Sequence, residues 1–313
     1  MPVSPIGARA TVVGGGLMGC GIAHVLAAGG ITVSVYEPSP DARATVLERI
    51  GASLDAVGAA RDPLDAITVT EDLEQAVADA DWVFEAAPER LELKRELFAR
   101  IDGAAPANAI LATNTSVISV GEIAADTRSP ERVVGAHWWN PAYLVPLVEV
   151  VQAERTSPKT VAATIELLQQ LGKTPVHVRR DVPGFVGNRL QHALWREAFS
   201  LIDDGVCDAT TVDTVVKSGF GLRLPVLGPI ENADLVGLGL TLDIHEYILP
   251  RLDPPSAPSP GLRARVERGD LGVGTGHGFR DWAEGEADAL RARLTDHLLR
   301  TASTATATQE ETA

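Results

Sequence analysis

The sequence predicts an α/β protein in which a mostly parallel sheet is followed by a smaller all-helical C-terminal domain. Three observations predict this fold. Residues 10–37 read as a short apolar strand, a glycine-rich turn, a helix and a second strand. Strand-like and helix-like runs then alternate as far as Arg179, as in a parallel sheet with helical crossovers. From Val186 onward apolar residues recur only at helical spacing.

The glycine-rich turn has the spacing of a Rossmann-type dinucleotide-binding unit. Gly14, Gly16 and Gly19 follow the apolar strand at G-x-G-x-x-G spacing, and a helix is predicted over 18–28. In such a unit the glycines allow a tight turn, a close approach of the backbone to a pyrophosphate and close helix packing, while the helix N-terminus faces the anion. The turn, with Leu17 and Met18, therefore predicts a nucleotide site; the alternative is a glycine-rich turn without a ligand.

The acid that ends the second strand indicates which nucleotide is bound. A strand predicted over 31–36 ends in Glu37, about where an acid accepts from a ribose 2′-hydroxyl. A phosphate on that hydroxyl would meet Glu37 as a like charge, and no arginine or lysine lies within 38–42. The sequence thus predicts NAD rather than NADP.

The remaining pattern divides the chain. A NAD-binding domain is predicted over 1–182, a helical domain for dimerisation and substrate over 183–300, and a disordered tail over 301–313, which lacks an apolar face. The predicted elements after the first unit are helices over 41–57, 72–78, 91–101 and 158–171, strands over 66–69, 81–86, 109–112, 132–137, 146–151 and 175–179, and C-terminal helices from 186 to 202 and near 210–217, 232–248 and 261–267.

Composition excludes several classes of function. A formal net charge of -15 over 313 residues argues against nucleic acid and against an anionic membrane surface. Cys20 and Cys207 lie far apart without metal-ligand spacing, so no metal is predicted and a reducing cytoplasm fits best. Because no export signal and no apolar run of about 18 residues occurs, the protein is expected to be soluble and cytoplasmic.

Five motifs occur in a recognisable order. After the glycine turn come AAPERLELK at 86–94, TNTS at 113–116, GAHWWNP at 135–141 and PGFVGNRL at 183–190, and GVGTGHGFRDW at 272–282 closes the series. Together they resemble the 3-hydroxyacyl-CoA dehydrogenase family. The resemblance implies that His137 is the catalytic histidine, Glu149 its partner carboxylate, and Ser116 and Asn188 a substrate-contacting pair. It also places four residues near nicotinamide and substrate, namely Glu89, Lys94, Asn114 and Asn140.

The residue types support this assignment independently. Oxidising a secondary alcohol requires a base, and histidine titrates near the working pH. His137 ends an apolar strand, and ligands bind outside the carboxyl ends of parallel strands. Glu149 is the lone carboxylate in an apolar run, so it needs a partner, which an imidazole on a neighbouring strand supplies. The alternative makes His137 a core histidine and Glu149 an exposed edge residue.

The substrate is the open question. Residues 38–80 contain three arginines, no lysine and nine acids, a balance that repels the phosphates of a CoA carrier. NPAYLVPLVE at 140–149 is closer to the branch that uses small free hydroxy acids, the gulonate 3-dehydrogenase (lambda-crystallin) and carnitine dehydrogenase type. The segment around Arg223 also resembles that branch, and the guanidinium is either a carboxylate-binding group or a surface residue.

We therefore expect an NAD-dependent L-3-hydroxy acid dehydrogenase. One alternative is a (S)-3-hydroxyacyl-CoA dehydrogenase of the 3-hydroxybutyryl-CoA type, and another is a nucleotide-binding structural protein of the crystallin kind. A long apolar face from Val186 to Ile202 predicts a homodimer, and the partner otherwise expected is a small hydroxy acid.

Overall fold

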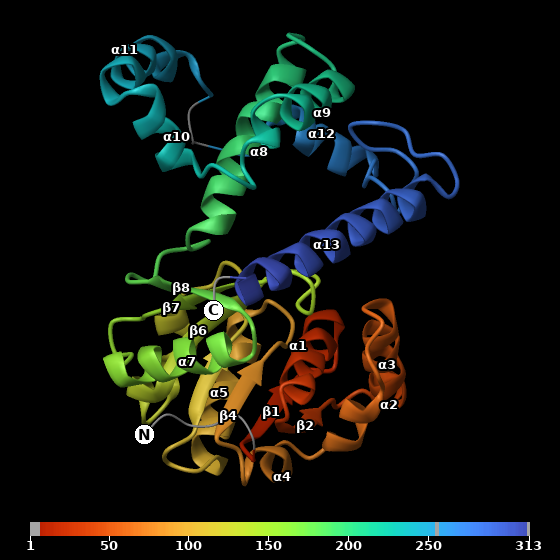
Figure 1. Ribbon diagram of the computed structural model, residues 1–313, viewed down its shortest axis with the longest axis vertical. Coiled ribbons are helices and arrows are strands. Elements are labelled where there is room, and N and C mark those ends of the chain that lie inside the picture. Colours follow the sequence, from red (N-terminus) through yellow and green to blue (C-terminus); the bar gives the residue numbers. More distant parts are fainter. Residues whose placement is uncertain (1–6, 254–256, 312–313) are drawn as a thin grey trace. The chain divides into compact units, whose positions relative to one another are not determined.

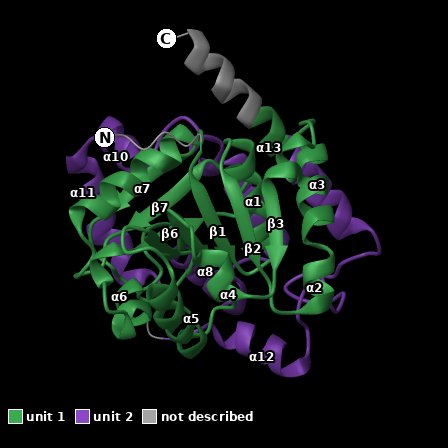
Figure 2. Cartoon of the chain, turned by 90° about the horizontal axis from the view of Figure 1, so that it is seen from below, with its two compact units in different colours: residues 1–189, 297–313 green, residues 190–296 purple. Residues whose placement is uncertain are grey.

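The computed structural model describes residues 7–253 and 257–311, and the chain forms two compact units (Figures 1 and 2). The first comprises residues 1–189 and 297–313, and the second comprises 190–296. The domain boundary predicted after residue 182 thus lies seven residues before residue 189, where the first segment of the first unit ends. Residues 1–6, 254–256 and 312–313 lie outside the described part, as do the side chains of 302–311.

The first unit is built on one eight-stranded sheet in the order β3-β2-β1-β4-β5-β6-β7-β8. The first six strands are parallel, β7 runs antiparallel to β6, and β8 is parallel to β7. The predicted strands therefore all exist, with ends shifted by at most one residue. Their bounds are β1 (Arg9–Val13), β2 (Thr32–Tyr36), β3 (Ile67–Thr70), β4 (Trp82–Glu85), β5 (Ile110–Thr113), β6 (Val133–Trp138), β7 (Leu147–Val151) and β8 (Thr174–Val178).

Helices cover both faces of this sheet (Figure 2). Apolar side chains of α1 (Leu17–Ala28), α3 (Val46–Ala56) and α7 (Pro158–Gln170) form one core with the sheet. Those of α4 (Leu73–Val77), α5 (Leu91–Ala104) and α6 (Val120–Ile123) form the other. Because both faces are buried, the central strands are mostly apolar, with buried Thr11, Glu85 and Thr113 as exceptions. Short helices complete the unit, namely α2 (Pro40–Ala44), η1 (Asp62–Ala66), η2 (Ala124–Asp126) and η3 (Pro130–Arg132).

Two helices predicted as continuous are interrupted. The helix expected over 41–57 divides into α2 and α3 at Thr45, whose hydroxyl donates to Ala42 O at 3.0 Å. The helix expected over 232–248 divides at Gly237, whose φ of 102° lies outside the helical region. Apolar periodicity continued across both interruptions, so the sequence pattern did not reveal them.

The second unit is helical. Helix α8 (Gly187–Asp203) begins in the first unit and continues into the second, ending before Gly205, which has a φ of 69°. The other elements are α9 (Ala209–Ser218), η4 (Phe220–Leu222), α10 (Pro229–Val236), α11 (Leu238–Ile248), η5 (Leu249–Arg251) and α12 (Pro260–Arg268). Helix α13 (Glu286–Glu311) begins in this unit and belongs to the first unit from residue 297 onward.

Helix α13 differs from the expectation for the tail. It continues through Glu311, whereas disorder was predicted from Thr301 onward. Alanine and glutamate have high helix propensity, and both recur in residues 302–311, so a helix begun by the preceding turns can extend without an apolar face. Among the described helices, none combines the length and apolar character needed to span a membrane.

Candidate active site

A buried imidazole and carboxylate pair lies at the hairpin of β6 and β7. His137 and Glu149 are direct partners in the antiparallel register, and His137 Nδ1 donates to Glu149 Oε2 at 2.8 Å. The residues are 5% and 1% exposed. With Nδ1 donating to the carboxylate, Nε2 of the neutral ring is the unprotonated nitrogen.

The second carboxylate oxygen of Glu149 is held by the start of α8. Its Oε1 accepts from Val186 N at 2.9 Å and from Gly187 N at 3.0 Å. Burial acts to raise the pKa of the Glu149 carboxyl, but hydrogen bonds from His137, Gly187 and Val186 outweigh it and lower the pKa below its ordinary value. The carboxylate therefore remains ionised beside the ring, where it can stabilise an imidazolium.

Two aromatic rings enclose the imidazole. The ring of Trp139 lies 5.3 Å from that of His137, and the ring of Phe185 lies 5.7 Å away. Phe185 is buried and has a φ of 50°, an unusual conformation for a bulky residue. A Cβ at Gly187 would lie 2.3 Å from Trp139 Cζ2, so glycine is needed there for the indole to occupy this place. The imidazole is thus fixed by packing as well as by Glu149.

Ser116 and Asn188 are brought together close to the start of α8. Asn188 Nδ2 donates to the backbone carbonyl of Ser116 at 3.0 Å. The turn that carries Ser116 is ordered by Glu89, which accepts from Thr115 Oγ1 at 2.6 Å, Ser116 N at 2.9 Å and Val117 N at 3.1 Å. Burial raises the pKa of the Glu89 carboxyl, but these hydrogen bonds and nearby Lys94 lower it overall. Glu89 thereby joins the site as an anion that holds the serine turn.

Lys94 is fully buried, and its ammonium has three acceptors. Its Nζ lies 2.7 Å from Glu85 Oε1, 3.2 Å from Ala87 O and 3.5 Å from Glu89 Oε2. Glu85 also accepts from Thr113 Oγ1 at 2.6 Å and from Ala87 N at 2.7 Å. The ammonium thus makes two hydrogen bonds, to Glu85 and to Ala87 O, and lies within ion-pair distance of Glu89. Glu85 is a site residue that the sequence analysis missed, although an acid ending the apolar run at 81–86 was a visible signal.

Asn114 and Asn140 have different surroundings. Asn114 Oδ1 accepts from Trp138 N at 2.8 Å, which ties the end of β5 to the end of β6. Asn140 is exposed and lies in the connection between β6 and β7, three residues after His137. Asn140 is thus near the dyad in sequence and free to face a ligand.

The glycine turn lies between β1 and α1. A Cβ at Gly14 would lie 2.8 Å from Ala86 O, and one at Gly19 would lie 1.8 Å from Gly14 O, so packing explains both glycines. A Cβ at Gly16 would meet no atom within 4 Å, so packing does not explain that one. Open space at this glycine, next to the N-terminus of α1 and exposed Leu17, fits the approach of a pyrophosphate.

Glu37 borders the same turn. Its Oε2 accepts from Gly15 N at 2.8 Å and its Oε1 accepts from Ser39 N at 2.9 Å. Oε2 is thereby directed to the glycine turn and Oε1 to the start of α2, and the side chain remains partly exposed. Because a carboxylate is acceptor-only, it suits a ribose hydroxyl and not a phosphate. Partly buried Met18 packs from α1 onto the core beneath this turn.

The three arginines after β2 are already engaged. Arg43 pairs with Glu71 at 2.6 Å, Arg61 pairs with Asp55, and Arg49 donates to Ala42 O at 3.1 Å. Arg223 differs, since it is exposed and its side chain contacts no acid in the part of the chain that is described. It belongs to the second unit, whereas the other candidate residues belong to the first.

Comparisons with known proteins agree with this architecture. Residues 9–182 match the model of the 3-hydroxyacyl-CoA dehydrogenase NAD-binding domain, and residues 184–282 match the model of the C-terminal domain of the same family. A 5-formyl-3-hydroxy-2-methylpyridine 4-carboxylate 5-dehydrogenase of Mesorhizobium japonicum is 35% identical over 291 residues, covering 90% of this chain and 93% of its own. An L-carnitine dehydrogenase of Streptomyces griseus is 41% identical over 233 residues, covering 73% and 70% respectively.

Solved structures point the same way. The structure of a 5-formyl-3-hydroxy-2-methylpyridine 4-carboxylic acid 5-dehydrogenase, described as an NAD+-dependent dismutase, has a TM-score of 0.87 at 32% identity and covers 94% of this chain and 96% of that one. A (S)-3-hydroxybutyryl-CoA dehydrogenase of Ralstonia eutropha has a TM-score of 0.73 at 32% identity, with 88% and 99% covered.

Proposed function

Since the chain belongs to the 3-hydroxyacyl-CoA dehydrogenase family and is an NAD-dependent oxidoreductase acting on CH–OH groups, we propose that it oxidises a small L-3-hydroxy carboxylate with a His137–Glu149 dyad as base. The observation that carries the proposal is the 2.8 Å hydrogen bond that fixes the His137 tautomer in a buried site. The relatives named for carnitine and for a pyridine carboxylate support a free acid over a thioester.

Oxidation of the secondary alcohol requires one side chain to act as a general base. NAD, when bound, supplies the acceptor for the hydride that leaves carbon. His137 Nε2 takes the hydroxyl proton as the C–O bond becomes a carbonyl, so the ring becomes an imidazolium. Glu149 lies against Nδ1 and offsets that positive charge. The step leaves a ketone and a protonated His137.

Ser116 and Asn188 suit the orientation of the substrate oxygen. In the described part of the chain, neither Ser116 Oγ nor Asn188 Oδ1 has a hydrogen-bond partner, while the backbone of Ser116 is held by Glu89 and Asn188. A fixed backbone with an unpaired hydroxyl is suited to donate to an oxygen that gains negative character. We assign both residues to substrate contact.

The charge distribution favours a free acid. A CoA carrier brings phosphates, and the segment after β2 would have to meet them with cations. Arg43, Arg49 and Arg61 are already bonded to acids or carbonyls, among nine acids in residues 38–80. Arg223 has no such partner among the described residues, so we assign it to the substrate carboxylate.

We propose a homodimer formed through the helical unit. Large apolar side chains there are exposed on α8, α10 and α11, including Leu194, Ile230, Leu235, Leu238 and Leu242. Monomeric proteins rarely expose so many apolar residues on consecutive elements. A second copy of the chain would cover them, and the mass in solution tests this.

A substrate panel decides among the candidates. The purified protein is assayed for NADH formation with L-carnitine, L-3-hydroxybutyrate, (S)-3-hydroxybutyryl-CoA and the reduced form of the pyridine carboxylate. We expect turnover of a free acid, abolished in His137→Ala. Turnover of the thioester alone would establish the acyl-CoA alternative, and absence of any turnover would favour the nucleotide-binding structural protein.

A further inference from the structure

The connection from β6 to β7 joins the two members of the dyad. It runs from Trp139 to Pro146 and includes Asn140. His137 and Glu149 pair one position inside the pair of Trp138 and Val148, at the end of the hairpin next to this connection. Movement of the connection would therefore be transmitted through a single pair of residues to the dyad.

Helix α1 holds one side of this connection. A Cβ at Gly21 would lie 3.0 Å from the Ala142 Cβ, so helix and loop are closely packed there. The ring of Tyr143 stacks on that of His24, with centroids 5.1 Å apart and planes 8° from parallel. His24 is itself fixed by Ser53, since its Nδ1 lies 2.7 Å from Ser53 Oγ. The loop thus has a rigid surface on its α1 side.

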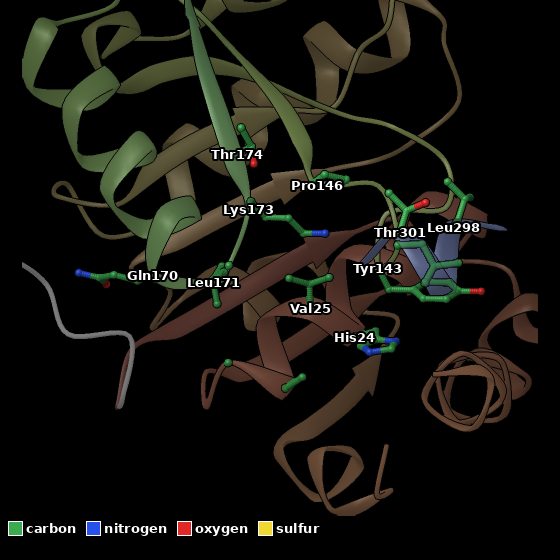
Figure 3. A pocket seen from close by; sticks show the side chains of 14 residues that line it. His24, Val25, Tyr143, Pro146, Gln170, Leu171, Lys173, Thr174, Leu298 and Thr301 are labelled. Carbon is green, nitrogen blue, oxygen red and sulfur yellow. The ribbon is translucent and has the colours of Figure 1, made fainter. Parts of the chain in front are cut away.

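Lys173 holds the other side. It lies in the turn from α7 to β8, and Figure 3 shows its side chain extending from that turn toward Tyr143. Its Nζ donates to Ala142 O at 2.5 Å and to Val145 O at 3.2 Å, and lies 5.4 Å from the centroid of Trp138. One ammonium therefore joins two points of the loop and the residue next to His137.

The ammonium has been buried without an acid. In the described residues no carboxylate pairs with Lys173, and burial lowers its pKa to about 8. Desolvating an ammonium is costly, so the two carbonyl bonds must offset that cost. Lys173 lines a cavity of about 550 Å³ together with His24 and Tyr143, and these are the titratable groups that face it. Burial of this ammonium is therefore costly, and its polar contacts are with the loop and with the face of Trp138.

We propose that Lys173 is a positioning residue for the oxidation, fixing the loop of residues 139–146 and, through Trp138, the alignment of His137 with Glu149. This inference rests on the proposed function for its kinetic consequence but not for its structural one. Lys173 contacts neither member of the dyad and acts through the loop.

The test compares Lys173→Met with Lys173→Arg and with Lys159→Met, in which an exposed lysine of α7 is replaced. Lys173→Gln, which keeps two donors without charge, is a milder second variant. Amide exchange of residues 139–147 is followed by mass spectrometry, and the Nδ1–H proton of His137 by NMR at low field. Neither measurement needs a substrate.

We expect Lys173→Met to raise exchange at Leu144 and Val145 about tenfold through loss of two hydrogen bonds, with exchange in the glycine turn unchanged. The His137 Nδ1–H signal should broaden, and kcat should fall about tenfold at a KM for NAD within about twofold of wild type. Lys173→Arg should recover part of kcat, because its guanidinium still donates. Lys159→Met should match wild type throughout.

Three results would overturn the inference: unchanged exchange in 139–147, a retained Nδ1–H signal in Lys173→Met, or raised exchange with unchanged kcat. A wild type that turns over none of the acids overturns the proposed function instead. In that case exchange and the Nδ1–H signal still decide whether Lys173 fixes the loop and the dyad.

Discussion

Replacing Glu149 by glutamine isolates the charge of the dyad without changing its size. In the wild type, Oε1 accepts from Val186 N and Gly187 N while Oε2 accepts from His137 Nδ1. The two backbone donors require an oxygen at the Oε1 position. The amide nitrogen of the introduced glutamine must therefore occupy the Oε2 position and present a donor to Nδ1.

Nδ1 then has to accept, which places the ring proton on Nε2 and removes the base. Restoring the productive tautomer requires the amide to flip, leaving the donors of Val186 and Gly187 unsatisfied at about 1–3 kcal/mol each. An imidazolium formed during reaction also loses a charge-assisted bond of about 1.5–3 kcal/mol. Even the lower ends of these costs together come to about 4 kcal/mol, which corresponds to a fall in kcat of at least about a thousandfold.

The assay is NADH formation under saturating NAD with the best acid of the panel. Glu154→Gln, which replaces an exposed acid just beyond β7, is the matched control and should keep the wild-type rate. Binding of NAD, measured by fluorescence titration, should be unchanged in both variants. A Glu149→Gln enzyme within about threefold of the wild-type kcat would refute the tautomer argument.

Three further outcomes follow. Gly187→Ala should displace Trp139 and lower kcat about tenfold, whereas Gly103→Ala, with open space around its Cβ, should not; equal rates would contradict the packing argument. Glu37→Gln should raise the KM for NAD about tenfold, measured by initial rates, and an unchanged KM would remove Glu37 from the ribose site. Burial and nearby Lys173 lower the pKa of His24 from 6.5 to about 4. As the pH falls below 6.5, His24 is therefore protonated in the unfolded chain but not in the folded one, and the free energy of unfolding decreases until the pH reaches about 4. Urea unfolding at pH 7 and pH 5 should show wild type losing about 2 kcal/mol more than His24→Gln, and equal losses would contradict it.

The fold could be predicted because its signals are local. An apolar run that ends in Gly14 or in Glu37 marks both a strand and the edge at which it stops. The pairing of His137 with Glu149 could also be predicted from the sequence, since two apolar runs that are close together each carry one such polar residue. The 3-hydroxyacyl-CoA dehydrogenase motifs directed attention to these residues, and the antiparallel register supplies the geometry.

What the sequence did not provide depends on contacts between distant segments. Thr45 and Gly237 break helices whose apolar pattern continues across them, because the break depends on one residue's conformation. Phe185 adopts a positive φ that no propensity predicts. The placement of Lys173 on two loop carbonyls requires knowing where the loop lies, which no sequence spacing gives.

Lys94 shows how the fold changes the meaning of a motif residue. The family resemblance places Lys94 near nicotinamide and substrate, and its ammonium lies against Glu85, Ala87 O and Glu89. Two hydrogen bonds and an ion pair within the first unit fix this buried ammonium in place. Its charge adds to the hydrogen bonds from Thr115 and Val117 in lowering the pKa of the Glu89 carboxyl, and Glu89 accepts from the backbone of Ser116. Lys94 is therefore linked to Ser116 through Glu89, and its loss should alter the placement of the serine that we propose to contact the substrate.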